Sequence, residues 1–169
     1  VSTSQAVVGA ILGIGLLNRQ LNVAGLGKVV ACWFGTPVGG AVIAVISYKI
    51  LALLYNRVSM DLFESDILIR LSLVAAGSYA SYALGANNVA NVTAVFVGAG
   101  YLTGLNAALI GGLSIGLGII TFSRRVMETV GRKLVRLDPF SALIAVLAEA
   151  ITVHIYALLG VPVSTSQAV

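Results

Sequence analysis

The chain has 169 residues, of which 59% are hydrophobic and 9% are charged, and its mean hydropathy is +1.02. A soluble domain carries roughly 25% charged residues, so this composition excludes an ordinary soluble protein and predicts an all-α polytopic membrane protein. The single cysteine excludes a disulfide framework, and a net charge of only +4 gives no support for nucleic-acid binding.

The first element is an uncharged run over 1–17, which is short for a membrane span of about 20 residues. It fits the second arm of a re-entrant hairpin, or half of a broken helix. The run opens with the letters VSTSQAV, and residues 163–169 repeat them identically. Such a repeat indicates an internal duplication. We therefore expect the chain to hold one period of a longer protein, starting inside one copy of an element and ending inside the next.

A polar connection is expected over 18–28, followed by a long apolar helix over 29–55 that Pro37 is expected to kink. A charged, solvated loop over 56–70 then leads into the next helix. We expect the boundary between two repeats in this loop. Residues 1–63 would form the end of the first repeat, and residues 64–169 would form the second.

Residues 71–123 carry no charge, and this stretch is long enough for two spans with an interruption between them. We predict the interruption at residues 85–91, which read GANNVAN, because three asparagines at membrane depth are costly without partners. A broken helix would contain this motif. A second, glycine-rich span over 101–122 would follow it.

The next segment, over 123–138, combines five basic side chains with apolar residues at Val126, Val130 and Leu134. This spacing predicts an amphipathic helix lying on the bilayer surface. Its cationic bias indicates the cytoplasmic side. A solvated charged loop is the alternative reading.

The last apolar run, over 139–159, contains Glu149 and His154. A carboxyl group inside a span is a functional hypothesis by default, so Glu149 is a possible coupling residue, with a hydrogen-bonded structural role as the alternative. An intramembrane hydrolase that uses a serine and His154 is disfavoured, because there is no G-x-S-x-G setting and the serines are duplicated without a duplicated histidine. We therefore expect no enzymatic activity.

The second copy of the repeated motif follows a sharp break at Gly160 and Pro162. Ser164 then stands where a helix N-cap belongs, with Gln167 three residues later, which is the S-x-x-Q capping-box pattern. A helix start offers unpaired N–H groups and a partial positive charge, so it is suited to an anion. The alternative is that the hydroxyl groups only cap the helix.

The two motif copies and the asparagine motif share one character. Each is a predicted break in an apolar helix, rich in small polar groups and free of fixed charge. Secondary transporters build their sites from such breaks near the bilayer midplane. Two VSTSQ copies suggest two helix starts aimed at one anion from opposite sides. The predicted fold is therefore an inverted-repeat secondary transporter with broken helices and re-entrant hairpins.

These motifs resemble those of the inorganic phosphate transporter family (PiT), whose signature is G-A-N-D-V-A-N followed later in each half by P-V-S-T-T-H. The corresponding letters here are GANNVAN at 85–91 and PVSTSQ at 162–167. The segment RRVMETVGRKLVRLDP also resembles the family's loop between them. The resemblance covers the whole chain and implies a transporter of roughly twice this length.

The resemblance implies that phosphate is held by hydroxyl and backbone N–H groups of both motif copies, namely Ser2, Thr3, Ser4, Ser164, Thr165 and Ser166. It implies cation- or substrate-binding roles for five amide side chains, with sodium at the three asparagines, namely Asn87, Asn88, Asn91, Gln5 and Gln167. Two features depart from the family pattern. Asn88 replaces its Asp, and Gln5 and Gln167 replace its His, so the coupling ion stays open between sodium and a proton.

The function that the resemblance implies is transport of inorganic phosphate across the cell membrane, coupled to symport of sodium or a proton. The expected partners are phosphate, the coupling ion, the bilayer, the rest of the full-length transporter and a second copy in a homodimer, with no cofactor. A permease for sulfate or another tetrahedral oxyanion is the alternative, since the same helix starts would bind sulfate.

Overall fold

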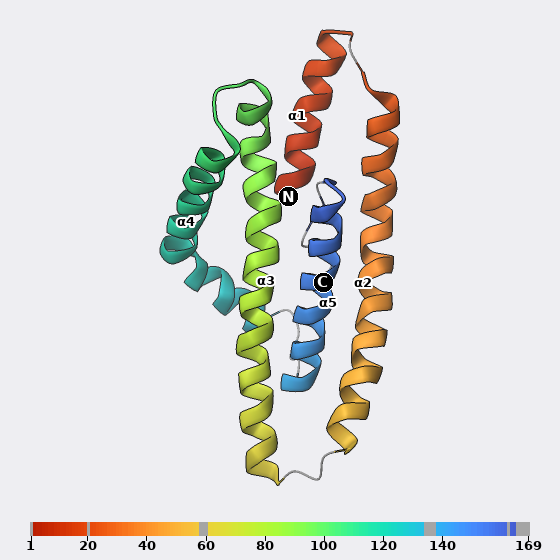
Figure 1. The fold of residues 1–169 in the computed structure, drawn as a ribbon, viewed down its shortest axis with the longest axis vertical. Helices are drawn as coiled ribbons and strands as arrows, with labels where there is room; N and C mark the ends of the chain where they lie inside the picture. Colours follow the sequence, from red (N-terminus) through yellow and green to blue (C-terminus); the bar gives the residue numbers. More distant parts are fainter. Residues whose placement is uncertain (1, 20, 58–60, 134–137, 162, 165–169) are drawn as a thin grey trace.

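The protein was analysed as a computed structural model, which describes residues 2–19, 21–57, 61–133, 138–161 and 163–164. Its helices are α1 (Thr3–Leu17), α2 (Val23–Arg57), α3 (Leu62–Gly98), α4 (Gly104–Lys133) and α5 (Pro139–Leu158), as Figure 1 shows. The described residues contain no strand. The predicted all-α class is confirmed.

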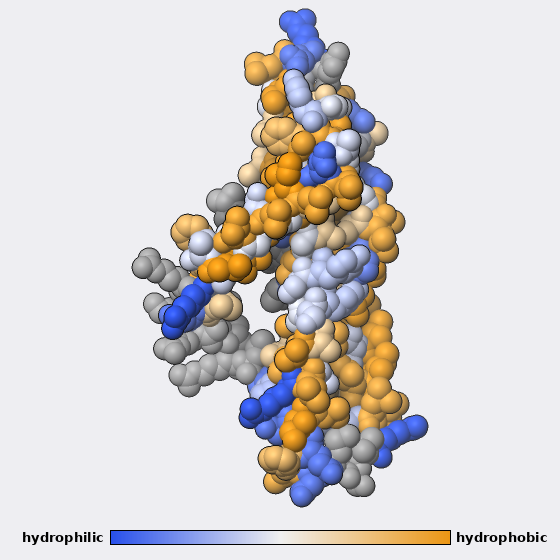
Figure 2. Space-filling view, turned by 60° about the vertical axis from the view of Figure 1, so that its left-hand side comes forward, coloured by the Kyte–Doolittle hydropathy of each residue, from blue (hydrophilic) through white to orange (hydrophobic). Residues whose placement is uncertain are grey.

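Four helices are long and apolar enough to cross a membrane: α2, α3, the part of α4 up to Arg124, and α5. The 35 residues of α2 span about 52 Å at 1.5 Å per residue, which exceeds the roughly 30 Å hydrocarbon core of a bilayer. Large apolar side chains lie exposed along these helices, and Figure 2 shows them covering much of one face. This surface is that of a multi-pass membrane protein, as predicted.

The helix starts are set by short polar side chains. Asn22 Oδ1 accepts from the backbone N–H of Gly25 at 2.9 Å, which starts α2 earlier than residue 29 and shortens the predicted polar connection. Asp61 and Glu64 form a capping box at the start of α3, as their spacing allows. Asp138 accepts from the N–H of Ser141 at 3.0 Å and begins α5.

The predicted interruption at residues 85–91 is wrong, because α3 runs unbroken through the whole asparagine motif. Asparagine costs a helix interior less than about 0.7 kcal/mol per residue, which a 37-residue helix tolerates. Asn87 and Asn91 instead donate hydrogen bonds from their side-chain nitrogens to other parts of the chain, while the backbone of α3 stays helical.

The real interruption between the two spans lies after α3, at Gly100. This glycine has φ of +76°, and its N–H donates to the carbonyl of Val97 while the N–H of Tyr101 donates to that of Phe96. The pattern is a Schellman motif, whose left-handed position favours glycine. Gly160, with φ of +66°, ends α5 in the same way, which confirms the predicted break there; Pro162 lies outside the described residues.

The segment over 123–133 is the C-terminal part of α4 and not a separate surface helix. Figure 1 shows α4 bending midway, with its second half departing from the direction of the first. An exposed ion pair links Arg124 to Glu128, with Nε and Oε1 3.6 Å apart. The predicted helix is therefore found up to Lys133, as a continuation of α4, and residues 134–137 lie outside the described part of the chain.

The helices pack around α3 and α5. In Figure 1, α5 lies between α3 and α2, α4 lies on the other side of α3, and the start of α1 lies beside the middle of α3. Ala80 and Ala83 of α3 meet Ala150 of α5 in the buried contact, where small residues let two helix backbones approach closely. The same face of α3 continues at helical spacing to Asn87 and Asn91, which are buried too.

Candidate functional site

The two copies of the repeated motif meet at the carbonyl oxygen of Val163. Ser4 Oγ, in the first turn of α1, donates to this oxygen at 2.8 Å, although the two residues are 159 positions apart. Asn87 Nδ2, from the middle of α3, donates to the same oxygen at 3.2 Å. Ser4 is 3% exposed and Val163 is fully buried. The predicted proximity of the two VSTSQ copies is confirmed for these residues.

Asn91 completes the network one helical turn further along α3. Its Nδ2 donates to Ser4 Oγ at 2.9 Å, so the Ser4 hydroxyl group both accepts from Asn91 and donates to Val163. Asn87 and Asn91 reach the same place because residues four apart share a helix face. The start of α1, the middle of α3 and the chain after α5 are thereby tied together.

The amide nitrogens of Asn87 and Asn91 are occupied by these bonds, whereas their oxygens are not. Among the described residues, neither Oδ1 atom accepts a hydrogen bond. Amide oxygens are hard ligands of the kind that suits alkali and alkaline-earth cations. In the same part of the chain, no three His, Cys, Asp or Glu side chains gather in a way that could hold a metal ion.

The backbone N–H groups at the start of α1 donate to no described residue. Ser2 is the N-cap residue, with φ of −76° and ψ of 130°, but its side chain makes no capping hydrogen bond. The capping pattern is therefore not realised in the first motif copy. The first intrahelical bond there is from the N–H of Ala6 to the carbonyl of Ser2. The N–H groups before Ala6 have no acceptor among the described residues, which leaves a helix N-terminus able to bind an anion.

A cavity of about 370 Å³, here named the asparagine cavity, lies beside this network. Three helices and the chain after α5 line it, through Val7, Val8, Ile11, Tyr82, Ala86, Asn87, Ala90, Asn91, Ala94, Val95, His154, Ala157, Leu158, Gly160 and Val161. None of these lining residues is Asp, Glu, Lys or Arg. The cavity therefore offers amide, imidazole and phenol groups on an apolar wall.

The other predicted site residues fall into three groups. Asn88 and Gln5 are half-buried and make no side-chain hydrogen bond within the described part of the chain. Ser164 is buried, next to Val163. Thr165, Ser166 and Gln167, together with the side chain of Thr3, lie outside what the structure describes.

Glu149 lies within α5 and is half-buried, and it does not line the asparagine cavity. Its neighbours Ala148 and Ala150 are buried. It makes no ion pair with any described residue. Glu149, the predicted possible coupling residue, therefore lies apart from the asparagine cavity.

Sequence reasoning gave His154 little weight, but the structure places it on the asparagine cavity. Tyr79 Oη and His154 Nδ1 lie 2.8 Å apart. The ring of Tyr82 packs edge-on against the imidazole, with the two ring centroids 5.7 Å apart. Tyr79 and Tyr82 are three residues apart on α3, so both rings face α5. The spacing of these tyrosines was the available signal, and only the pairing of α3 with α5 reveals it.

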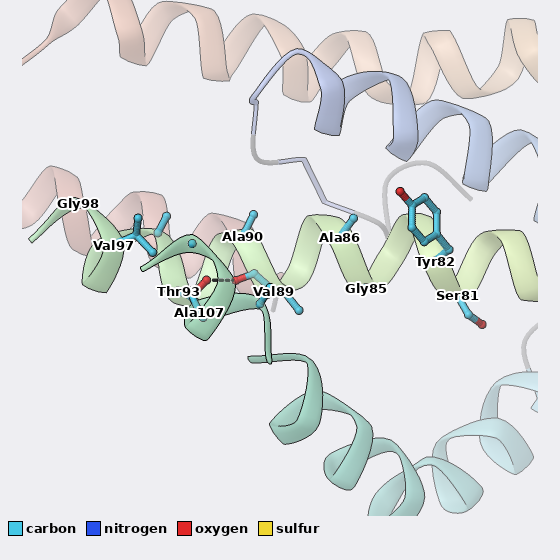
Figure 3. A pocket seen from close by; sticks show the side chains of 13 residues that line it. Ser81, Tyr82, Gly85, Ala86, Val89, Ala90, Thr93, Val97, Gly98 and Ala107 are labelled. Carbon is cyan, nitrogen blue, oxygen red and sulfur yellow. Dashed lines mark hydrogen bonds between the residues drawn. The ribbon is translucent and has the colours of Figure 1, made fainter. Parts of the chain in front are cut away.

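A second hollow, of about 830 Å³, lies on another side of α3 against α4, as Figure 3 shows. Its lining is apolar apart from Ser81, Tyr82 and Thr93, and the Thr93 hydroxyl group already donates to the carbonyl of Val89 at 2.8 Å. Polar groups that could bind a ligand together are therefore found in the asparagine cavity and not in this second hollow.

A model of the phosphate transporter family matches residues 56–169. The sulfate permease CysP of Bacillus subtilis is 30% identical over 166 residues, covering 98% of this chain and 46% of that protein. A protein of Methanocaldococcus jannaschii named as a candidate phosphate permease is 27% identical over 169 residues, covering 100% of this chain and 53% of its own length.

A sodium-dependent phosphate transporter of Danio rerio, 1-B, is 30% identical over 123 residues, covering 66% of this chain and 18% of that protein. No solved structure matches the chain. The chain spans about half the length of the first two relatives. The family model covers well over half of the described helices, from the end of α2 onward. The chain therefore belongs to the phosphate transporter family.

Proposed function

We propose that the full-length protein carries inorganic phosphate across the membrane, and that the anion binds where the two VSTSQ copies meet. The observation that carries this proposal is the hydrogen bond from Ser4 Oγ to the carbonyl of Val163, with Asn87 and Asn91 joined to it. It supports a single site built from both motif copies. A site free of fixed charge lets an anion enter and leave, which a transporter requires.

The anion would be held mainly by backbone donors of α1. The N–H groups of its first turn lack acceptors among the described residues, and the Ser2 hydroxyl group makes no capping bond. Both are therefore suited to phosphate oxygens. Ser4 differs, because its proton is already donated to Val163; it would bind phosphate only if that bond opened. Thr3, Ser164, Thr165 and Ser166 stay predicted ligands.

The coupling cation would bind at the amide oxygens of Asn87 and Asn91, which accept no hydrogen bond among the described residues. Sodium is supported by the name of the Danio rerio relative. Asn88 lies about 100° from Asn87 around the helix, so it would contribute from another side of α3. Gln5, Gln167 and Glu149 stay predicted participants in cation or substrate binding and in coupling, and the homodimer stays a prediction.

Sulfate is the second candidate substrate. The Bacillus subtilis relative is named a sulfate permease, and its match covers nearly all of this chain. Backbone N–H groups at a helix start bind any tetrahedral oxyanion. They do not distinguish phosphate from sulfate by charge or shape alone.

The deciding experiment is uptake of labelled phosphate by the full-length protein in proteoliposomes, with and without a sodium gradient. We expect uptake that saturates with phosphate and is weakly inhibited by excess unlabelled sulfate. Uptake of labelled sulfate that excess phosphate does not inhibit would make the sulfate reading correct. Uptake of neither anion would contradict the proposal.

A further inference from the structure

We propose that α2 is hinged at Pro37, and that the tip of Tyr156, seated against Gly35, transmits bending of this hinge to the point where the two motif copies meet. The inference rests on the proposed function, because a carrier must open its site to each side of the membrane in turn, and hinge bending is one way to do so. It is drawn from one turn of α2 and from the contact of this helix with α5, which lies beside it in Figure 1.

Three departures from a regular helix fall within one turn of α2. Pro37 lies inside the helix and has no N–H, so the carbonyl of Trp33, four residues earlier, lacks its helical donor. The Thr36 hydroxyl group donates to the carbonyl of Cys32 at 2.7 Å, a kind of bond that often bends helices. The indole N–H of Trp33 is buried and has no acceptor among the described residues. The hydrogen bonding of α2 is therefore weakened at this turn, as a hinge requires.

Two glycines of the same region form a notch for the side chain of Tyr156. A methyl group placed on Gly35 would lie 2.9 Å from the Tyr156 hydroxyl oxygen, and one placed on Gly39 would lie 3.9 Å from it. Outside the surrounding turns of α2, no other described atom comes within 4 Å of either methyl position. The tip of Tyr156 thus lies against α2 at positions two residues on either side of Pro37.

Tyr156 also connects this notch to the candidate site. Its backbone carbonyl accepts from the N–H of Val161 at 3.1 Å, a bond that closes the end of α5. Val163 follows two residues later, and its carbonyl oxygen accepts the bonds from α1 and α3. Both valines are buried, so the connection is held by packing as well as by hydrogen bonds. A displacement of Tyr156 therefore moves the carbonyl of Val163.

The first test of the hinge is Pro37→Ala in the full-length protein. Alanine supplies the missing N–H to the carbonyl of Trp33, so the unfolding temperature should rise. The stiffer helix should lower the maximal rate of phosphate uptake into proteoliposomes about two- to tenfold, with the dissociation constant of phosphate unchanged.

Gly27→Ala is the matched control, because a methyl group there meets nothing within 4 Å and stabilises the same helix away from the hinge. It should raise the unfolding temperature without slowing uptake. An unchanged uptake rate in Pro37→Ala, or equal slowing in Gly27→Ala, would overturn the hinge.

Amide hydrogen exchange, followed by mass spectrometry, tests the hinge in the absence of substrate. In the wild type we expect residues 33–41 to exchange faster than residues 43–51 of the same helix. Exchange over residues 33–41 should slow in Pro37→Ala and stay at the wild-type rate in Gly27→Ala. Equal exchange over this turn in the wild type and Pro37→Ala would contradict a hinge at Pro37.

The transmitting contact is tested by Gly35→Ala, alone and combined with Tyr156→Phe. In Gly35→Ala the new methyl group pushes the tip of Tyr156 away, so the unfolding temperature should fall and phosphate binding should weaken about two- to tenfold. Removing the hydroxyl group leaves that methyl position without a described neighbour from another helix, so the double variant should regain wild-type stability and affinity. A lower unfolding temperature with unchanged phosphate affinity in Gly35→Ala would overturn the transmission to the site.

Failure of these proposals can be told apart from failure of the proposed function. If the wild type binds sulfate and not phosphate, the proposed substrate is wrong, and the same constants measured with sulfate decide the transmission. If the wild type binds neither anion, the proposed function is wrong, whereas hydrogen exchange and the unfolding temperatures still decide the hinge and its contact with Tyr156. If Pro37→Ala does not fold, wild-type stability and affinity in Gly35→Ala would overturn the inference.

Discussion

Ser4 Oγ lies 2.8 Å from the carbonyl oxygen of Val163, so the first turn of α1 is joined to the chain that follows α5. The two residues belong to two identical copies of one motif. Asn87 and Asn91 of α3 extend the contact into a buried network of three hydrogen bonds. The two copies of the duplicated motif are thus in contact with each other in the structure.

The first prediction concerns this network. Ser4→Ala removes the hydroxyl group, which leaves Asn91 Nδ2 buried without its acceptor. A buried donor without a partner costs about 1–3 kcal/mol, so the variant should unfold at a lower temperature. Thermal unfolding of the full-length protein in detergent measures this. Ser78→Ala is the control, because the Ser78 hydroxyl group is exposed and bonds only within its own helix. Equal unfolding temperatures in the two variants would show that the network contributes nothing to stability.

The second prediction concerns the packing of α4 on α3. A methyl group at Gly111 would lie 2.9 Å from Thr93 Cγ2 and 3.0 Å from Val89 Cγ1. Both neighbours are β-branched, and the hydroxyl group of Thr93 is bonded to the carbonyl of Val89, so neither yields easily. Gly111→Ala should therefore destabilise the protein by about 1–3 kcal/mol.

Gly112 provides the matched control, since a methyl group there meets nothing within 4 Å. Gly112→Ala should stabilise the helix by about 0.5–1 kcal/mol, because alanine loses less backbone entropy than glycine. Chemical or thermal unfolding of both variants gives the comparison. A stabilising effect at Gly111 would mean that α4 does not pack on α3 as described.

The third prediction concerns Asn88, where the chain has an amide in place of the family's carboxylate. Asn88→Asp should tighten sodium binding and weaken phosphate binding when sodium is low. The sign follows from the Coulomb interaction of a new negative charge with both ions, which is on the order of a few kcal/mol in a partly dry site. The measurement is the phosphate transport constant across a sodium titration. Asn106→Asp, at an exposed position in the first turn of α4, is the control. Identical sodium dependence in wild type and Asn88→Asp would assign Asn88 a structural role.

The fourth prediction concerns pH and the start of α5. Hydrogen bonds from the side chain and the backbone N–H of Ser141 lower the pKa of Asp138 below its ordinary value. A carboxyl whose pKa is lowered by folding stabilises the protein above its unfolded pKa, and this contribution is lost as the pH falls through the folded pKa. Asp138→Ala should therefore lower the unfolding temperature at neutral pH and make a smaller difference in strong acid, where the charge contribution is lost. The same difference at every pH would show that the carboxylate charge is unimportant; Asp138→Asn, which keeps an acceptor, should behave in between.

The sequence predicted the helical class, the apolar runs that form the spans and the meeting of the motif copies, because each follows from a strong pattern. The apolar runs need no tertiary information, and the motif is repeated identically. The prediction from sequence failed where contacts with residues remote in the sequence decide the conformation. Three asparagines in seven residues were interpreted as a break, yet Asn87 and Asn91 lie on the buried face of an unbroken helix. Their partners, Ser4 and Val163, are remote in sequence and could not be inferred from the motif alone.

The candidate site, too, could be predicted only in part from the sequence. The motif copies pointed to Ser2 and Ser4 together, whereas the structure distinguishes them: Ser4 is bonded on both sides, and Ser2 makes no capping bond. His154 was given little weight because it lies five residues from Glu149, which is a poor helical pairing. Its contact with Tyr79 depends on the pairing of α3 with α5.

The most direct measurement of the central idea, that an anion binds at the start of α1, is protection of that position from a thiol reagent. Ser2→Cys would be prepared in the full-length protein with Cys32 replaced by Ala, and Ser78→Cys in the same background is the control. We predict that phosphate slows modification at position 2 in proportion to its occupancy and leaves position 78 unaffected. Equal rates at position 2 with and without phosphate, in a protein that still transports phosphate, would contradict this account.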